Sequence, residues 1–286
     1  MRLHILKALG WIASKTGKRG RKILALGIGL ALYYLLPERR RLTVENLRYA
    51  FPATTKAQIL RLARRCFINL ALVFLELLAT PYLSIAILRS YFHFVNPEVI
   101  RQTKTQGQGV VLLSAHLANW EWSAIVAALE FGEPLLVVVK QQRDYVINQW
   151  LDRVRQRTGN ILVPMHRAAK SMLQWLEKGG IVALLVDQAA EPTSDVFVPF
   201  FGRPAITYKA PVLLARRMNA LLVVGYSLRD KDGRYVVQFV PIPRANDPSV
   251  PVEDVVAEYT HVLESVIRQV PEQWVWQHNR WKYLQH

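Results

Sequence analysis

The feature that most constrains the fold is a series of short, continuous apolar runs that begins after Gly109. These runs alternate with stretches whose apolar residues recur at helical spacing. The runs are Val110–Ser114, Leu135–Val139, Ile161–Val163, Ile181–Val186, Leu221–Ser227 and Tyr235–Val240. Because such runs are typical of strands buried on both faces, their alternation with helices predicts an α/β fold. Asp230–Gly233 predicts a turn between the last two strands, so we expect a hairpin within a mixed sheet flanked by helices.

Helices are expected before and after this region. Residues 1–13 carry apolar residues at near-helical spacing and predict an amphipathic helix. Thr55 and Gln58 form a plausible capping box, which would open a helix that runs to about Ala79. Val252–Val270 predicts a final amphipathic helix.

The charge of the chain is unevenly distributed. The 286 residues include 37 Lys+Arg and 21 Asp+Glu, a net charge of +16, yet 51% of residues are hydrophobic, which excludes intrinsic disorder. Residues 1–65 hold 15 of the bases and two of the acids. Because this basicity is local to a hydrophobic region, it argues against nucleic-acid binding. The single cysteine, Cys66, excludes a disulfide framework and a cysteine-rich zinc site.

The basic region contains one apolar run, Ile23–Leu36, between the basic clusters 18–22 and 39–41. Its 14 residues would span only about 21 Å as a helix, against a hydrocarbon core of about 30 Å. The run therefore predicts a short tilted span or a helix in the membrane interface, and a helix buried in a soluble core is the alternative. Because these two basic clusters would attract anionic lipid headgroups, we expect residues 1–45 to be a helical membrane anchor.

The sharpest chemical feature is the segment 110–122, VVLLSAHLANWEW. An apolar strand is expected to end in small residues, with His116 directly after it. A helix with Glu121 in its first turns is expected to follow. A histidine that transfers protons needs an acidic neighbour to fix its tautomer and stabilise the imidazolium. Since no serine or cysteine nucleophile is evident, we expect a dyad that acts on a substrate hydroxyl.

The same spacing occurs at His93 and Glu98. Pro97 disfavours a helical first turn just before that acid, and no predicted strand precedes His93. We therefore take His116 as the site, with a histidine merely satisfied at a strand end as the alternative.

Residues 111–121 resemble the hallmark block of the bacterial lipid A biosynthesis (lauroyl/myristoyl) acyltransferases, within the lysophospholipid and glycerophosphate acyltransferase superfamily. Residues 36–52, 187–207 and 271–282 resemble further blocks of that family in the same order. Relatives often have Phe-Gly where this chain has Leu117-Ala118. The resemblance implies a glycerophosphate-acyltransferase-like fold, with residues 46–286 as the acyltransferase domain.

The resemblance also implies roles for individual residues. His116 corresponds to the general base and Glu121 to its partner. An acceptor hydroxyl would lose its proton to His116 and attack the thioester of an acyl carrier protein or coenzyme A donor, and the oxyanion would need preorganised donors. The candidates for substrate binding or oxyanion stabilisation are Asn119, Arg157, Asp187 and Thr207.

Two of these candidates have alternatives. Arg157 is preferred among the four arginines that follow the second strand, Arg143, Arg153, Arg155 and Arg157, and a solvated helix face is the other interpretation. Asp187 is expected to bind an acceptor phosphate or position an arginine, or else simply to cap a helix. Trp274 and its neighbouring tryptophans are interpreted as a structural and interfacial cluster.

The resemblance implies an O-acyltransferase at the cytoplasmic face of the bacterial inner membrane. No metal and no cofactor are expected beyond acyl-carrier-protein or coenzyme A thioester as co-substrate. The expected partners are membrane lipids, an acyl carrier protein and a lipid A precursor or related glycolipid. The alternatives are a lysophospholipid or phosphoinositol-mannoside-type acyltransferase and, from another class, a non-catalytic lipid-binding membrane protein.

Overall fold

A computed structural model describes residues 2–283. Met1 and residues 284–286, which the predicted segments include, lie outside the described residues. A seven-stranded sheet has the order β1-β9-β8-β2-β5-β3-β4, and β6 and β7 form a separate pair. The strands are β1 (Phe92–Val95), β2 (Val110–Ser114), β3 (Leu135–Val139), β4 (Ile161–Pro164), β5 (Ile181–Leu185), β6 (Val196–Phe200), β7 (Arg203–Thr207), β8 (Leu221–Arg229) and β9 (Tyr235–Pro241).

The directions of the strands confirm the predicted mixed sheet. β2 pairs in parallel with both β5 and β8, and β3 pairs in parallel with β4 and β5. β9 returns antiparallel to β8 through the turn at Asp230–Gly233, as predicted. The edge strand β1 and the β6–β7 hairpin were not predicted. β6 and β7 are joined through Phe201 and Gly202, whose positive φ values of 53° and 74° suit a two-residue hairpin turn.

The central strands are buried on both faces, which explains their continuous apolar runs. Val111 and Leu113 of β2 face one half of the core, while Val110 and Leu112 face the other. The first half includes α9 (Ala168–Glu177), α10 (Ala210–Met218) and α11 (Val252–Gln269). The second includes α5 (Ile85–Ser90), α6 (Glu98–Thr105), α7 (Trp120–Phe131) and α8 (Tyr145–Arg155). Short 3₁₀ turns are η1 (Thr80–Tyr82), η2 (Met165–Arg167), η3 (Pro243–Asn246) and η4 (Pro271–Gln273).

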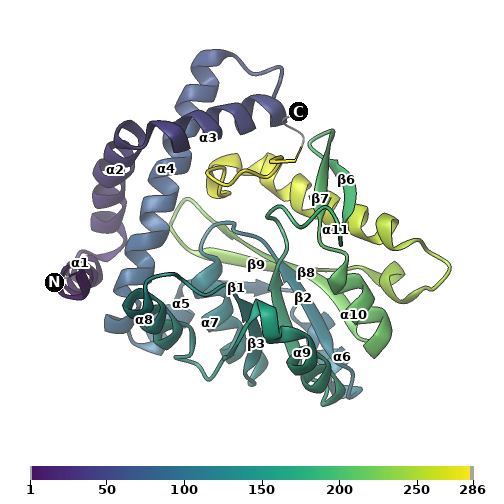
Figure 1. The fold of residues 1–286 in the computed structure, drawn as a ribbon. Helices are drawn as coiled ribbons and strands as arrows, with labels where there is room; N and C mark the ends of the chain where they lie inside the picture. The colour runs from purple at the N-terminus through teal and green to yellow at the C-terminus, as the bar shows by residue number, and fades with distance from the viewer. Residues whose placement is uncertain (1, 284–286) are drawn as a thin grey trace.

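An N-terminal helical layer lies beside this sheet (Figure 1). Its helices are α1 (Arg2–Lys15), α2 (Gly17–Leu35), α3 (Pro37–Ala50) and α4 (Lys56–Ala79). The predicted capping box is present, since the Thr55 side chain accepts from the Gln58 backbone and the Gln58 side chain accepts from the Thr55 backbone. α4 contributes to both halves of the core, through Phe67 in the first and Leu75 in the second. It therefore joins the helical layer to the sheet.

The apolar run Ile23–Leu36 forms most of α2 and is not a buried core helix. Its buried side is a stripe of Arg21, Ala25, Gly29 and Tyr33, which faces α4. The aliphatic side chains Ile23, Leu26, Ile28, Leu35 and Leu36 are exposed, Ile23 and Leu35 at 71% and 73%, while Leu24 and Leu32 are partly buried against the core. This arrangement reverses the one expected of a helix buried in a soluble core.

Within residues 2–283, no single helix has both the length and the apolar composition that a membrane span requires. α2 and α3 meet these requirements only together, and they are bent by 96° where they meet. The predicted boundary between residues 45 and 46 falls inside α3. A membrane anchor is therefore considered below as a proposal.

Gly29 tests the packing of α2 on α4. A Cβ atom at Gly29 would lie 2.4 Å from Cα of Ile68, whereas one at Gly27 would meet nothing within 4 Å. We predict that Gly29→Ala lowers the free energy of unfolding by about 1–3 kcal/mol, because backbone must shift. Gly27→Ala, the matched control, should leave it unchanged or raise it by up to about 1 kcal/mol through helix propensity. Denaturant unfolding of both variants measures the difference, and equal effects would contradict the close packing.

Candidate active site

The segment between β2 and α7 forms a tight, anchored turn. Asn119 caps α7, because its Oδ1 accepts from the Trp122 backbone N–H at 3.0 Å. Ala118 has a φ of 49°, in the left-handed region. The C-terminal segment pairs with this turn: the Ala118 N–H donates to the Gln273 carbonyl at 2.9 Å, and the His116 carbonyl accepts from the Val275 N–H at 3.2 Å. The chain end therefore holds the His116 turn in place.

His116 is bound directly by Asp187. Asp187 follows β5, the parallel neighbour of β2, so the two residues meet at one edge of the sheet. Nδ1 of His116 lies 2.9 Å from Oδ1 of Asp187, and the His116 backbone N–H donates to Oδ2 at 2.9 Å. The Trp274 indole N–H also donates to Oδ2, at 2.7 Å. Asp187 thus accepts from two segments that are distant in sequence.

This contact shifts the pKa values of both groups. Burial lowers the pKa of His116, but the charge and hydrogen bond of Asp187, with a smaller contribution from Glu121, outweigh it and leave the pKa above 6.5. Burial raises the pKa of Asp187, yet its contacts with His116 and Trp274 bring it below 3.8. The carboxylate is therefore ionised near neutral pH and favours a proton on the imidazole.

Glu121 lies in the first turn of α7, as predicted, and its hydrogen bonds are to Arg155. Nε of Arg155 donates to Oε2 at 2.8 Å and a terminal nitrogen donates to Oε1 at 2.5 Å, a bidentate pair. Both side chains are more than four-fifths buried. The structure thus pairs Nδ1 of His116 with Asp187 and the Glu121 carboxylate with Arg155, while the charge of Glu121 still raises the pKa of His116.

The other predicted residues bind parts of the scaffold. Arg157 donates to the carbonyls of Thr80 and Leu83, which fixes the end of α8 to the chain after α4. Asn119, besides capping α7, donates to Glu76 at 3.0 Å.

Thr207 accepts from the buried Arg280 at 2.5 Å. Like Arg157 and Asn119, it makes its hydrogen bonds to residues other than His116 within the described part of the chain. The rival His93 is exposed on β1, and Glu98 pairs with Arg101.

Residues not assigned to the site from sequence also surround His116. The side-chain nitrogen of Gln188 lies 3.4 Å from Nε2 of His116, and the Trp120 ring packs edge-on at 5.1 Å between centroids. Trp274, interpreted from sequence as structural, contacts Asp187 directly. In the sequence, the one feature that could have indicated Trp274 and Gln188 as site residues is that both lie in blocks resembling the acyltransferase family. Across residues 2–283, no group of three histidine, cysteine or acidic side chains is arranged to hold a metal ion.

Residues 3–283 match the profile of the family described as bacterial lipid A biosynthesis acyltransferases. The chain belongs to this family. It is therefore an acyltransferase, and the resemblance drawn from its sequence blocks is confirmed.

Characterised relatives cover most of the chain. A lipid A biosynthesis lauroyltransferase of Escherichia coli (strain K12) is 26% identical, over 91% of this chain and 84% of the relative. A lipid A biosynthesis acyltransferase of Haemophilus influenzae is 24% identical, over 87% and 77%. A lipid A biosynthesis palmitoleoyltransferase of E. coli K12 is 21% identical, over 89% and 82%. Their names include two different acyl chains, so family membership alone does not fix the chain length.

The contact between His116 and Asp187 predicts a measurable change in titration. In Asp187→Asn the charge that raises the pKa of His116 is removed while its burial remains, so this pKa should fall below the wild-type value. Histidine side-chain NMR over a pH series measures it. The signals of the exposed His93 on β1 are the internal reference for the pH series. A His116 pKa that stays constant would contradict the assignment of Asp187 as the charge partner.

Proposed function

We propose that this acyltransferase moves a fatty acyl chain from an acyl-carrier-protein or coenzyme A thioester to a hydroxyl of a lipid A precursor, at the cytoplasmic face of the inner membrane. The observation that carries the proposal is His116 at the end of β2, with one ring nitrogen held by a buried carboxylate. The family assignment supports the acceptor, because the relatives are named for lipid A biosynthesis.

His116 is proposed as the general base. With Nδ1 protonated toward Asp187, Nε2 carries the lone pair that takes the proton of the acceptor hydroxyl, which would replace the 3.4 Å contact with Gln188. The hydroxyl oxygen then attacks the thioester carbonyl to form a tetrahedral intermediate. As that intermediate collapses, the ester C–O bond remains, the C–S bond breaks, and the proton on Nε2 passes to the leaving thiolate. Asp187 holds the tautomer and stabilises the transient imidazolium throughout.

Glu121 and Arg155 are proposed to supply fixed charges beside this base. In the dyad proposed from sequence, Glu121 is the partner of His116, and its negative charge favours the imidazolium. Of the four candidate arginines, Arg155 hydrogen-bonds to Glu121 of the His116 motif. We therefore propose Arg155, rather than Arg157, as the positive group near the developing oxyanion. The bidentate pair would keep both charges preorganised.

Membrane association is proposed through α1 and α2. Both helices expose large apolar side chains, including Trp11 at 54% and Leu35 at 73%, within the most basic region of the chain. A helix with such an apolar outer face suits the membrane interface, where the flanking bases meet anionic headgroups. We propose that α2 lies in the interface with its outer face toward the acyl chains.

Two other functions predict different results. A lysophospholipid or phosphoinositol-mannoside-type acyltransferase would prefer those acceptors when each is offered with a labelled donor. A non-catalytic lipid-binding protein would bind lipid without turnover. The buried His116–Asp187 contact favours catalysis, because it orients the ring and fixes its tautomer, as proton transfer requires.

Replacing the proposed base should abolish most of the activity. We expect His116→Ala to lower the rate of acyl transfer to a lipid A precursor by about 10²–10⁴-fold, since general-base catalysis contributes that much. Glu121→Gln should lower it to a smaller extent. His93→Ala and Glu98→Gln, the residues that repeat the motif spacing, are matched controls and should leave the rate unchanged. Near-wild-type rates in a folded His116→Ala protein would rule out the base.

The outer face of α2 predicts a loss of membrane binding. Replacing Ile23 and Leu35 together by Asn should weaken binding to vesicles at least about tenfold, since burying each apolar side chain contributes roughly 1.5–3 kcal/mol. The control replaces Phe197 and Leu213 together by Asn. Both side chains are exposed outside the helical layer, so vesicle binding should not change. Vesicle flotation measures both, and equal binding by all variants would contradict the proposed insertion of α2.

A further inference from the structure

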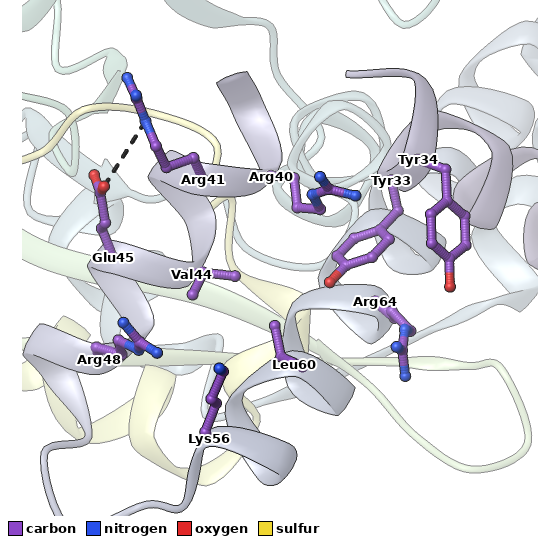
Figure 2. A pocket seen from close by; sticks show the side chains of 10 residues that line it. All are labelled: Tyr33, Tyr34, Arg40, Arg41, Val44, Glu45, Arg48, Lys56, Leu60 and Arg64. Atoms are coloured by element: carbon purple, nitrogen blue, oxygen red, sulfur yellow. Dashed lines mark ion pairs between the residues drawn. The ribbon is translucent and has the colours of Figure 1, made fainter. Parts of the chain in front are cut away.

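A basic pocket of about 470 Å³ lies between α3 and α4, at the end of α2 (Figure 2). Two helical stripes line it. Arg40, Val44 and Arg48 recur every four residues on α3, and Lys56, Leu60 and Arg64 do so on α4. Each stripe therefore presents a base, an apolar residue and a base, one helical turn apart.

The pocket is lined by five bases and one acid. The acid, Glu45, forms an ion pair with the exposed Arg41 at 3.8 Å. Arg40 and Arg64 both pack against the Tyr33 ring, at 5.5 and 5.6 Å from its centroid. Nε of Arg64 is buried without a hydrogen-bond partner. Cations gathered in this way repel one another unless an anion lies between them, so the pocket is suited to an anionic group.

The rim of the pocket indicates the kind of anion. Tyr34 lines the pocket and is 58% exposed, and the next residues, Leu35 and Leu36, are 73% and 42% exposed. The basic pocket is thus continuous with the apolar outer face of α2. A free phosphate would use only the bases, whereas a lipid places its phosphate among them and its acyl chains along the apolar face.

We propose that this pocket binds the phosphate headgroup of an anionic membrane phospholipid, with Arg40 and Arg64 as the main ligands. Their guanidinium groups donate in the fork geometry that matches phosphate oxygens, and Tyr33 holds the two guanidinium groups in position. This site lies outside the His116 turn. It rests on the proposed membrane association and not on the proposed chemistry.

The test compares binding of the full-length protein to vesicles of phosphatidylcholine with and without phosphatidylglycerol. Arg40→Gln combined with Arg64→Gln should reduce the preference for phosphatidylglycerol at least about tenfold. The matched control, Lys15→Gln combined with Arg19→Gln, removes the same charge from exposed positions of the same basic region and should reduce it by a smaller factor. Arg40→Lys with Arg64→Lys keeps the charge but loses the fork geometry, and should give an intermediate loss.

A second pair of substitutions tests the pocket if the Arg40 and Arg64 variant does not fold. Arg48→Gln with Lys56→Gln alters exposed residues at the other end of the pocket and should also reduce the preference more than the control does. Equal losses in the pocket and control variants would overturn the site in favour of general charge attraction. Competition by millimolar inorganic phosphate as strong as by the lipid would overturn a lipid ligand. A raised KM for the lipid A precursor in detergent, with unchanged vesicle preference, would instead assign the pocket to the acceptor.

The Ile23 and Leu35 variant separates this proposal from that of membrane insertion. If α2 inserts and the pocket binds headgroups, this variant should bind all vesicles less but keep its relative preference for phosphatidylglycerol. Acyl transfer in detergent should be unchanged in the pocket variants, because none of their residues contacts the His116 turn.

Discussion

The site depends on one buried carboxylate. Asp187 accepts hydrogen bonds from the backbone and ring of His116 and from the indole of Trp274. Its two carboxylate oxygens therefore link the end of β5 to the His116 turn and to the C-terminal segment. An ionised carboxylate is stable at this depth only because each contact offsets its desolvation. The same contacts fix the imidazole and attach the C-terminal segment to the end of β2. The same hydrogen bonds therefore position the proposed base and join the C-terminal segment to the sheet.

A second buried network links the helical layer to this site. Glu76 of α4 accepts from Arg229 at 2.7 Å, from the Tyr235 hydroxyl at 2.5 Å and from Asn119 at 3.0 Å. Asn119 in turn caps α7, which carries Glu121. Because α4 also packs against α1 and α2, the helices proposed to meet the membrane are connected through one helix to the turn that holds His116. A buried network of this kind stabilises a single arrangement only when every member is satisfied.

The sequence predicted the repeating elements well and the long-range contacts poorly. Strands such as Val110–Ser114 and the α4 capping box are local patterns, set by burial on both faces and by residues three apart. The edge strand Phe92–Val95 was missed because it is short, half exposed and lacks a continuous apolar run. At the site, spacing indicated His116 and Glu121 as candidates, but it did not indicate that Asp187, 71 residues away, binds the ring. That contact follows from strand order, since β5 neighbours β2 although three α-helices and two strands separate them along the chain.

The structure of the helical layer explains why the basic residues are concentrated near the N-terminus. Side chains of α2 are divided between a small-residue stripe that permits close approach to α4 and an outward apolar face. Once that face is placed in lipid, the neighbouring bases lie at headgroup depth, where attraction to anionic lipid is strongest and least screened. Five bases on α3 and α4 line a pocket beside this face, where they repel one another. The proposed headgroup would remove that repulsion, which solvation only screens.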